Sequence, residues 1–138
     1  IYLHINSFGG GVFAAFHGID VIKQSAIPVH TIVEVATASA GTLLSVVGAK
    51  RYIRPHASML VHQLSSWFGG KLAEIDDEYA NKQQMHETIK GIYTAHTRMA
   101  GNELDGLLRH DLWWKADKCV EQGLADALWH EPAAKSRQ

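Results

Sequence analysis

The feature that most constrains this chain is a β-branched apolar run that passes through a turn of very small residues into another apolar segment. Residues 29–35 are rich in valine, isoleucine and threonine, which is typical of a buried strand. Residues 36–41 are all small, and residues 42–47 continue as a buried helix. A strand that enters a helix in this way presents its turn residue and the free N–H groups of the helix start at the same point.

Strands and helices alternate along the rest of the chain. We expect further strands at 1–6, 51–53, 59–61 and 124–129, and further helices at 12–24, 71–99, 103–109 and 116–122. Residues 64–70, which contain serine and glycine, are expected to form a loop or irregular strand, and residues 132–138 a frayed tail. This order predicts an α/β fold with a largely parallel sheet.

Length and charge limit the partners of the chain. Its 138 residues suit a single domain at 1–138. Thirteen basic and fourteen acidic residues give a net charge of −1, so neither nucleic acid nor a membrane surface is expected as a partner. No apolar run approaches the roughly 20 residues of a membrane span. Because the chain opens as a strand without methionine, we expect an N-terminal segment to be missing.

The cysteine and histidine content bears on redox compartment and on metal binding. Cys119 is the only cysteine, which rules out an internal disulfide and a thiolate zinc cluster and suits a reducing compartment. Among nine histidines, His86 is followed by Glu87, but Lys90 stands where the helical zinc motif needs a second histidine. We therefore expect no metal site and no cofactor.

Ser39 is the first candidate for chemistry, because it sits in the small-residue turn. Its neighbours Ala38, Ala40 and Gly41 leave room for a substrate carbonyl beside the hydroxyl. The alternative is that these small residues only let the helix start pack closely on the sheet.

A serine nucleophile needs a base, and the base needs an acid to orient it. His62 ends the apolar run at 58–61, so its imidazole, a side chain that can act as a general base near neutral pH, stands at a strand tip. Asp111, shortly before the helix at 116–122, is a candidate acid, and Asp105 and Glu34 are rivals on sequence alone. The structural alternatives are a strand-end histidine bonded to a carbonyl, and a helix cap or surface ion pair for Asp111.

Three consecutive glycines at 9–11 follow the first expected strand. They lack the spacing of a phosphate-binding loop and of a dinucleotide-binding turn. A better functional interpretation is an exposed N–H that stabilises an oxyanion, next to a strand edge that receives an extended peptide. The alternative is a turn that simply needs positive φ.

Four short segments stand out along residues 1–128, and each is weak alone. They are Ile5-Asn6-Ser7-x-Gly9-Gly10, Ala38-Ser39-Ala40-Gly41, Met59-Leu60-Val61-His62-Gln63 and Ala116-x-x-x-Val120-Glu121-x-Gly123-Leu124-Ala125-Asp126. Their order and spacing are specific, and together they resemble the Clp protease proteolytic subunit family of serine peptidases. Phe8 and Leu64 depart from the family, which usually has proline at both positions, and this change affects loop rigidity more than chemistry.

The resemblance implies a ClpP/crotonase-type fold with flanking helices and a protruding handle helix at 71–99. It implies that Ser39 is the nucleophile, that His62 is the general base, and that the N–H groups of Gly10 and Ala40 form the oxyanion hole. A substrate backbone would lie as an added strand between two edges of the protein. These edges are formed by Gly9, Gly11 and Val12 on one side and by Ser66, Trp67, Phe68, Gly69 and Gly70 on the other.

The position of the acid depends on a loop length. An ungapped match to the bacterial housekeeping enzymes puts Leu107 at the acid, whereas a shortened loop puts Asp111 there. Asp111 followed by Trp113 before the last helix resembles the ClpP-like peptidases of phages and prophages, as do Glu34 and the 64–70 loop. We therefore take Asp111 as the third catalytic residue.

The resemblance also implies partners and a location. It implies a homo-oligomer of heptameric rings, which in the family pair into a tetradecamer, peptides or unfolded proteins as substrates, and an AAA+ unfoldase as a candidate partner. The implied location is the cytoplasm of a bacterium or of a virus-infected bacterial host. Two alternatives stay open: a ClpR-like structural subunit without activity, and a crotonase-type enzyme acting on acyl-CoA, which would not need a Ser-His pair.

Overall fold

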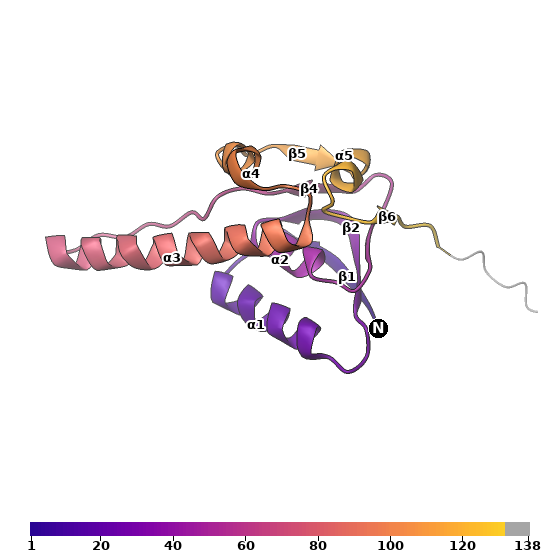
Figure 1. Cartoon of the computed structure of the whole chain (residues 1–138), viewed down its shortest axis with the longest axis horizontal. Coiled ribbons are helices and arrows are strands. Elements are labelled where there is room, and N and C mark those ends of the chain that lie inside the picture. The colour runs from indigo at the N-terminus through magenta and orange to yellow at the C-terminus, as the bar shows by residue number, and fades with distance from the viewer. Residues whose placement is uncertain (132–138) are drawn as a thin grey trace, which may run out of the picture.

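A six-stranded, mostly parallel sheet forms the centre of the fold, as the sequence predicts (Figure 1). The computed structural model describes residues 1–131, so the tail expected at 132–138 lies outside the described residues. The central strand β2 (His30–Ala38) pairs in parallel with β1 (Tyr2–Ser7) on one side. On its other side it pairs in parallel with β3 (Arg51–Ile53) and β4 (Ser58–Leu60).

Two short strands complete the sheet at its ends. β6 (Ala127–Leu128) pairs in parallel with β3, and β5 (Trp113–Lys115) pairs antiparallel with β4. The strand β5 is absent from the sequence expectation, which has a loop there. It exists because its three residues find hydrogen-bonding partners on the free edge of β4, a contact that no local pattern reports.

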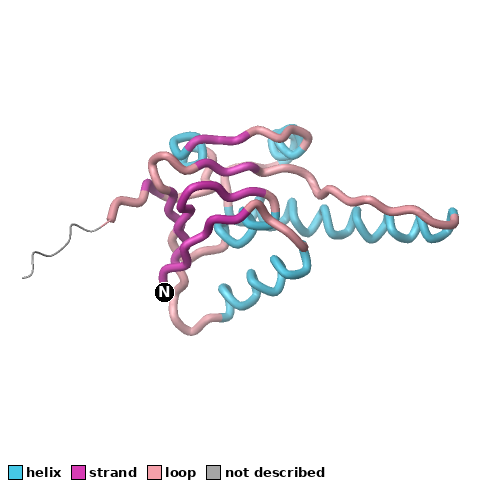
Figure 2. The backbone as a smooth tube through the Cα atoms, turned by 180° about the vertical axis from the view of Figure 1, so that it is seen from behind, coloured by secondary structure: helices cyan, strands magenta, loops and turns pink. Residues whose placement is uncertain are grey.

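Helices α1 (Val12–Gln24) and α2 (Ala40–Val46) follow the first two strands. α2 lies against β1 and β2 and also contacts α1, so it forms the layer between the sheet and the outer helices (Figure 2). Buried side chains from the sheet and from α2 make the centre of the core: Val33, Leu43, Val46 and Ile53. Their burial removes apolar surface from water, which is the main force that holds the layers together.

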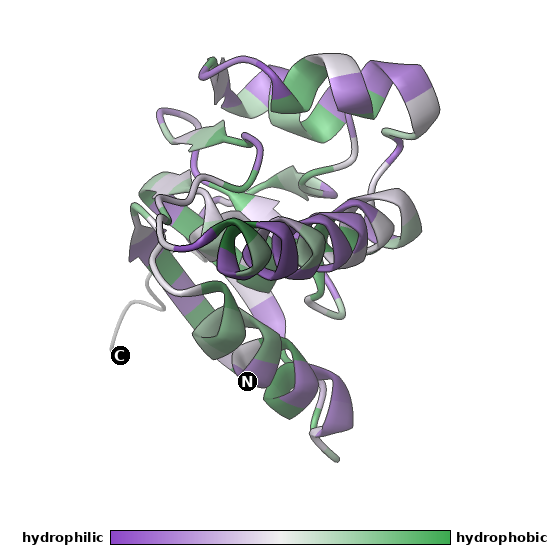
Figure 3. Cartoon of the chain, turned by 90° about the vertical axis from the view of Figure 1, so that its left-hand side faces the viewer, coloured by the Kyte–Doolittle hydropathy of each residue, from purple (hydrophilic) through white to green (hydrophobic). Residues whose placement is uncertain are grey.

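The helix α3 (Leu72–His96) is the expected handle helix and projects far beyond the sheet (Figure 1). Its 25 residues span about 37 Å at 1.5 Å per residue. Ile89 and Tyr93 near its end are buried, whereas most of its first half is exposed. Figure 3 views α3 nearly end-on and shows many hydrophilic residues along it, in contrast to the largely hydrophobic α1.

The chain closes with α4 (Gly101–Leu108) and α5 (Ala116–Glu121), which lie near β5 (Figure 1). Across residues 1–131, none of the helices combines the length and apolar character that crossing a bilayer requires.

Two sequence expectations need correction. The small residues 36–38 extend the strand β2 rather than forming the turn, because they pair with β4, so that Ser39 alone separates β2 from α2. The strand expected at 124–129 shrinks to Ala127–Leu128. The N–H groups of Leu124 and Ala125 both donate to the carbonyl of Cys119, which wraps these residues around the end of α5.

Candidate active site

Ser39 occupies a strained turn between β2 and α2. Its φ of 55° and ψ of −130° make it the one non-glycine residue with positive φ in the described part of the chain. Such a conformation costs about 1–3 kcal/mol and persists only where neighbouring contacts impose it. Here the Ser39 N–H donates to the Leu60 carbonyl at 3.0 Å, and the Ser39 carbonyl accepts from the N–H and the hydroxyl of Thr42 at 2.9 and 2.6 Å.

The ends of three neighbouring strands bring the candidate residues together. The glycines at 9–11 follow β1, Ser39 follows β2, and His62 comes shortly after β4. Since β1 and β4 both pair in parallel with the last residues of β2, these carboxyl ends lie side by side. Ligands in open parallel sheets bind at such ends. Ser39 and His62 line the same cavity here, together with Gly10 and Ala40.

The antiparallel pairing of β5 with β4 brings Asp111 to His62. In this register Ser58, Met59 and Leu60 face Lys115, Trp114 and Trp113, and two further steps set Asp111 opposite His62. Their side chains approach to 3.6 Å between His62 Nδ1 and Asp111 Oδ1. This is an ion-pair distance, longer than the usual 2.7–3.2 Å of a hydrogen bond. The Asp111 side chain is 79% exposed, so this contact is held loosely.

The other acids considered from sequence are paired elsewhere. Asp105 lies 2.7 Å from Lys90 Nζ, and this contact lowers the pKa of the Asp105 carboxyl. Glu34 accepts a 2.6 Å hydrogen bond from Arg54, which together with His4 lowers the pKa of Glu34. Leu107, the residue of the ungapped match, packs against the apolar core.

The two backbone groups expected to form an oxyanion hole border the same cavity as Ser39. Ala40 is the first residue of α2, so its N–H has no partner within the helix. Gly9 packs directly on the turn at Ser39, because a Cβ at Gly9 would stand 2.7 Å from the Ser39 Cβ. Gly9 and Gly10 have φ of 100° and 151°, a region where glycine carries no Cβ strain. Glycine at residue 9 therefore allows the loop to approach Ser39.

The cavity beside Ser39 is narrow, about 60 Å³, and its lining combines polar and apolar groups. Four of the residues that line it were not assigned to the site from the sequence. These are Leu43 from α2, Ile89 and Tyr93 from α3, and Leu64 from the segment after His62. A signal for two of them was present, since Ile89 and Tyr93 are spaced by four in an otherwise polar helix and so share one face.

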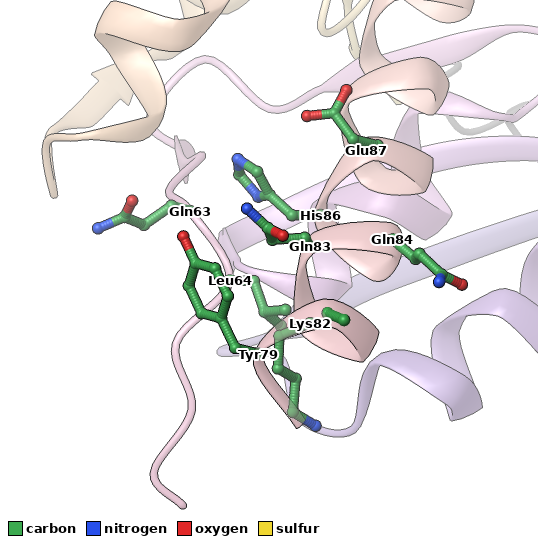
Figure 4. Close-up of a pocket in the computed structure, with 9 residues that line it drawn as sticks. Gln63, Leu64, Tyr79, Lys82, Gln83, Gln84, His86 and Glu87 are labelled. Carbon is green, nitrogen blue, oxygen red and sulfur yellow. The ribbon is translucent and has the colours of Figure 1, made fainter. Parts of the chain in front are cut away.

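A larger cavity, about 860 Å³, lies between α3 and the segment after His62 (Figure 4). It shares Gln63 and Leu64 with the narrow cavity, and Tyr79 and His86 line it from α3. Figure 4 shows the Tyr79 ring beside Leu64. A third cavity of about 170 Å³ lies behind the glycine loop and includes Gly9, Gly10, Gly11 and Ala40.

Of the two predicted peptide-binding edges, one lines the cavities near Ser39 and the other is an outer segment of the chain. Val12 lines the narrow cavity, and Gly9 and Gly11 line the cavity behind the glycine loop. Residues 66–70, namely Ser66, Trp67, Phe68, Gly69 and Gly70, run outward along the handle helix with no regular secondary structure, and the Trp67 side chain is 92% exposed. The role of this outer segment in binding stays a prediction.

Within residues 1–131, neither the Cys119 thiol nor a metal-binding cluster provides an alternative reactive site. Burial raises the pKa of the Cys119 thiol to about 12, so the thiol remains protonated at neutral pH. Among residues 1–131, no group of three or more His, Cys, Asp or Glu side chains is gathered in a way that could hold a metal ion.

Comparison with known proteins assigns the chain to a family. Residues 1–132 match the family described as Clp protease. The chain belongs to the Clp protease family. This confirms the resemblance drawn from the four sequence segments, and it supports a peptidase of the ClpP type.

Named relatives agree with this assignment. The chain is 30% identical over 128 residues to the ATP-dependent Clp protease proteolytic subunit 1 of Chlamydia muridarum, which covers 90% of this chain and 67% of that protein. It is 32% identical over 130 residues to the proteolytic subunit 1 of Streptomyces avermitilis. That match, like one to the proteolytic subunit 3 of Streptomyces coelicolor, spans 93% of this chain and 60% of the relative.

Proposed function

We propose that this chain is a serine endopeptidase that cleaves peptide bonds through an acyl-enzyme on Ser39. The observation that carries the proposal is the meeting of Ser39, in its strained positive-φ turn, with His62 in one cavity at the carboxyl ends of adjacent strands. A sharp strand-to-helix turn that exposes a serine hydroxyl beside a histidine is the arrangement that serine hydrolases use.

In the first half of the reaction, His62 takes the proton of the Ser39 hydroxyl as the oxygen attacks the substrate carbonyl. The imidazolium then gives that proton to the leaving amine, and the acyl group remains on Ser39. In the second half, His62 takes a proton from water, which attacks the ester, and returns it to Ser39. Asp111, 3.6 Å from His62 Nδ1, holds the required tautomer and stabilises the charged ring.

The N–H groups of Gly10 and Ala40 stabilise the oxyanion of both tetrahedral intermediates. Both residues border the cavity that contains Ser39, which supports this role. Loss of one such donor typically costs about 3–4 kcal/mol of transition-state stabilisation. The rigid approach of Gly9 to Ser39 keeps the donor loop at the required distance.

Family membership supports protein substrates and assembly into rings as further parts of the proposal. We propose heptameric rings that pair through the projecting handle helix α3, and unfolded polypeptides that reach the site through an AAA+ unfoldase. Binding through backbone pairing would give little sequence preference of its own, since main-chain hydrogen bonds are common to all peptides.

The test uses the Ser39→Ala variant with a fluorogenic peptide and a fluorophosphonate probe. The wild-type chain is expected to hydrolyse the peptide and to carry the probe on Ser39, and the variant to do neither while keeping its assembly state. Ser25→Ala, which changes a serine in the turn after α1, is the matched control and should keep both activities. Retained labelling of Ser39→Ala would remove the nucleophile assignment.

The same experiment addresses the two alternatives. A ClpR-like structural subunit would assemble without labelling or hydrolysis. A crotonase-type enzyme would bind coenzyme A esters and leave the peptide intact, so coenzyme A binding measured in parallel separates the second alternative from the proposal.

A further inference from the structure

We propose that Tyr93 sets the substrate preference of this site, by closing the pocket beside Ser39 so that it accepts only small side chains such as alanine or valine. The side chain concerned belongs to the residue whose carbonyl carbon is attacked. This inference rests on the proposed function and deepens it, because it names the class of peptide bond that is cleaved.

The groups that hold the substrate carbonyl determine which cavity receives the substrate side chain. A carbonyl carbon attacked by Ser39, with its oxygen held at Gly10 and Ala40, has its own side chain directly beside these residues. The narrow cavity is bordered by all three and by His62. The cavity behind the glycine loop borders Gly10 and Ala40 but includes neither Ser39 nor His62, so it does not receive this side chain.

The size of the narrow cavity limits what it can hold. Its volume is about 60 Å³. For comparison, an engineered apolar cavity of about 150 Å³ in another protein binds benzene. A space less than half as large holds the methyl groups of alanine or valine and excludes the ring of phenylalanine. Its inner walls are fixed, because Leu43 and Ile89 are only 2% and 5% exposed.

Tyr93 forms the buried floor of this cavity and is held there by a hydroxyl relay. Its oxygen lies 2.6 Å from the Thr42 hydroxyl, which in turn donates to the Ser39 carbonyl at 2.6 Å. Because Thr42 donates its one hydroxyl proton to the Ser39 carbonyl, Tyr93 must be the donor in the bond between the two hydroxyls. Burial raises the pKa of Tyr93 to about 12, so the donor stays protonated. The ring cannot swing away without breaking this bond and leaving the buried Tyr93 hydroxyl without its acceptor.

The outer wall of the cavity is more easily displaced than the inner walls. Leu64 and Ser65 belong to the irregular segment after His62, and Leu64 is half-buried. Beyond Leu64 lies the larger cavity lined by Tyr79 and His86 (Figure 4). A bulky substrate side chain would have to push Leu64 into that space, and the cost of this displacement adds to the discrimination.

The experiment compares peptides that differ only in the residue before the cleaved bond: alanine, valine, leucine or phenylalanine. For the wild-type chain we expect kcat/KM for alanine and valine to exceed that for phenylalanine by at least about tenfold, because the ring does not fit the available volume and a small difference in side-chain size in a packed pocket already gives discrimination of this order. Tyr93→Leu, which removes ring volume from the floor, is expected to bring this ratio close to one.

Two further variants complete the design. Ile89→Ala enlarges the same pocket from its wall and should also lower the ratio, so the test stands even where Tyr93→Leu does not fold. Ile75→Ala makes the same substitution as Ile89→Ala on the same helix, at a half-buried residue that lines neither cavity, and it should keep the wild-type ratio.

The outcomes separate this inference from the proposed function. If the probe labels Ser39 and the wild-type chain cleaves after phenylalanine as fast as after alanine, the pocket assignment is overturned and the peptidase remains. If both pocket variants keep the wild-type ratio, the role of Tyr93 is likewise overturned. Failure of the probe to label Ser39 overturns the proposed function, and this inference with it.

Discussion

Asp126 and Asp111 each face a basic side chain, and they do so in opposite ways. Asp126 binds Arg51 through both of its oxygens, with Arg51 Nη2 at 2.5 Å and Arg51 Nε at 3.2 Å, and it also accepts the Arg51 N–H at 2.8 Å. The same guanidinium donates to the carbonyls of His96 and Gly123, and its side chain is only 15% exposed. Asp111 has one contact to His62, at 3.6 Å, and is mostly in solvent.

The difference shows what each pair does. The Arg51 cluster joins β3 to the ends of α3 and α5, and nearly every polar group in it is satisfied, which is how buried charges are made tolerable. In the proposed peptidase, the loose contact of His62 would leave the imidazole free to exchange protons with Ser39. Catalytic hydrogen bonds are often long in the free enzyme and tighten with substrate. Substitutions at Arg51 are therefore expected to lower stability, and substitutions at the proposed catalytic residues are expected to lower activity.

The largest expected effect is on activity, at Ser39. Ser39→Ala should lower kcat for peptide hydrolysis by at least about 10⁴-fold, because the covalent step is lost. Ser39→Gly should be equally inactive but more stable by about 1 kcal/mol, since glycine relieves the cost of positive φ. Fluorogenic peptide assays and urea unfolding check both. A Ser39→Gly variant that is less stable than wild type would contradict the strain argument.

Asp111→Asn comes next and should lower kcat by about 10²–10⁴-fold, because the imidazole loses the carboxylate that orients it. Its unfolding free energy should change by less than about 0.5 kcal/mol, since the side chain is 79% exposed. Asp105→Asn is the matched control and should keep turnover, because Asp105 pairs with Lys90. Near-normal turnover of Asp111→Asn would point to a Ser-His dyad or to another acid.

The opposite pattern is expected at Arg51. Arg51→Met should lower the free energy of unfolding by about 2–4 kcal/mol, because it removes both side-chain donors of the Asp126 carboxylate and the guanidinium donor of the His96 and Gly123 carbonyls. The folded fraction should keep wild-type kcat. Lys82→Met, which removes a surface pair with Glu78, should cost less than about 1 kcal/mol. Equal stability losses in the two variants would contradict the structural role of the Arg51 cluster.

A smaller effect links packing to chemistry at Gly9. Gly9→Ala should destabilise the chain by about 1–3 kcal/mol, since the new Cβ would stand 2.7 Å from the Ser39 Cβ at positive φ. It should also lower kcat more than it raises KM, because the turn is displaced. Gly91→Ala, in α3 with open space around it, should instead stabilise the helix by about 0.5–1 kcal/mol. Thermal unfolding and steady-state kinetics measure both.

The smallest expected effect is the pH dependence contributed by Glu34. Its hydrogen bond to Arg54, together with His4, lowers the pKa of Glu34 below its ordinary value of 4.5. A lowered carboxyl pKa stabilises the fold above the ordinary value, and this contribution disappears as the pH falls through the lowered pKa. The stability difference between wild type and Glu34→Gln, about 1 kcal/mol or less, should therefore vanish in acid. A difference that grows below pH 4.5 would contradict this assignment.

Much of the fold followed from local patterns in the sequence. The helix expected at 12–24 is observed as α1 (Val12–Gln24), because its apolar stripe and its flanking glycines and proline are all local signals. The strand expected at 51–53 is observed as β3 (Arg51–Ile53). The long helix expected at 71–99 is observed as α3 (Leu72–His96), shorter at both ends, where boundaries depend on capping contacts.

The site was less predictable, because it depends on pairing between distant segments. Ser39 and His62 could be proposed from short motifs. Asp111 could be separated from its rivals Asp105 and Glu34 only by a resemblance, since its approach to His62 follows from the antiparallel strand β5, whose three residues are too few to show a strand pattern. Tyr93 lies in a mostly polar helix, and only the packing of α3 on α2 brings its hydroxyl to Thr42.

The central claim is that His62 activates Ser39 across the ends of two adjacent strands. The rate of fluorophosphonate labelling, with the labelled residue identified by peptide mass spectrometry, tests it most directly in the wild-type chain and in His62→Ala. The account predicts that the wild-type chain is labelled at Ser39 and that His62→Ala slows this labelling by at least about 10³-fold. Labelling at another residue, or at Ser39 with an unchanged rate in His62→Ala, would contradict it.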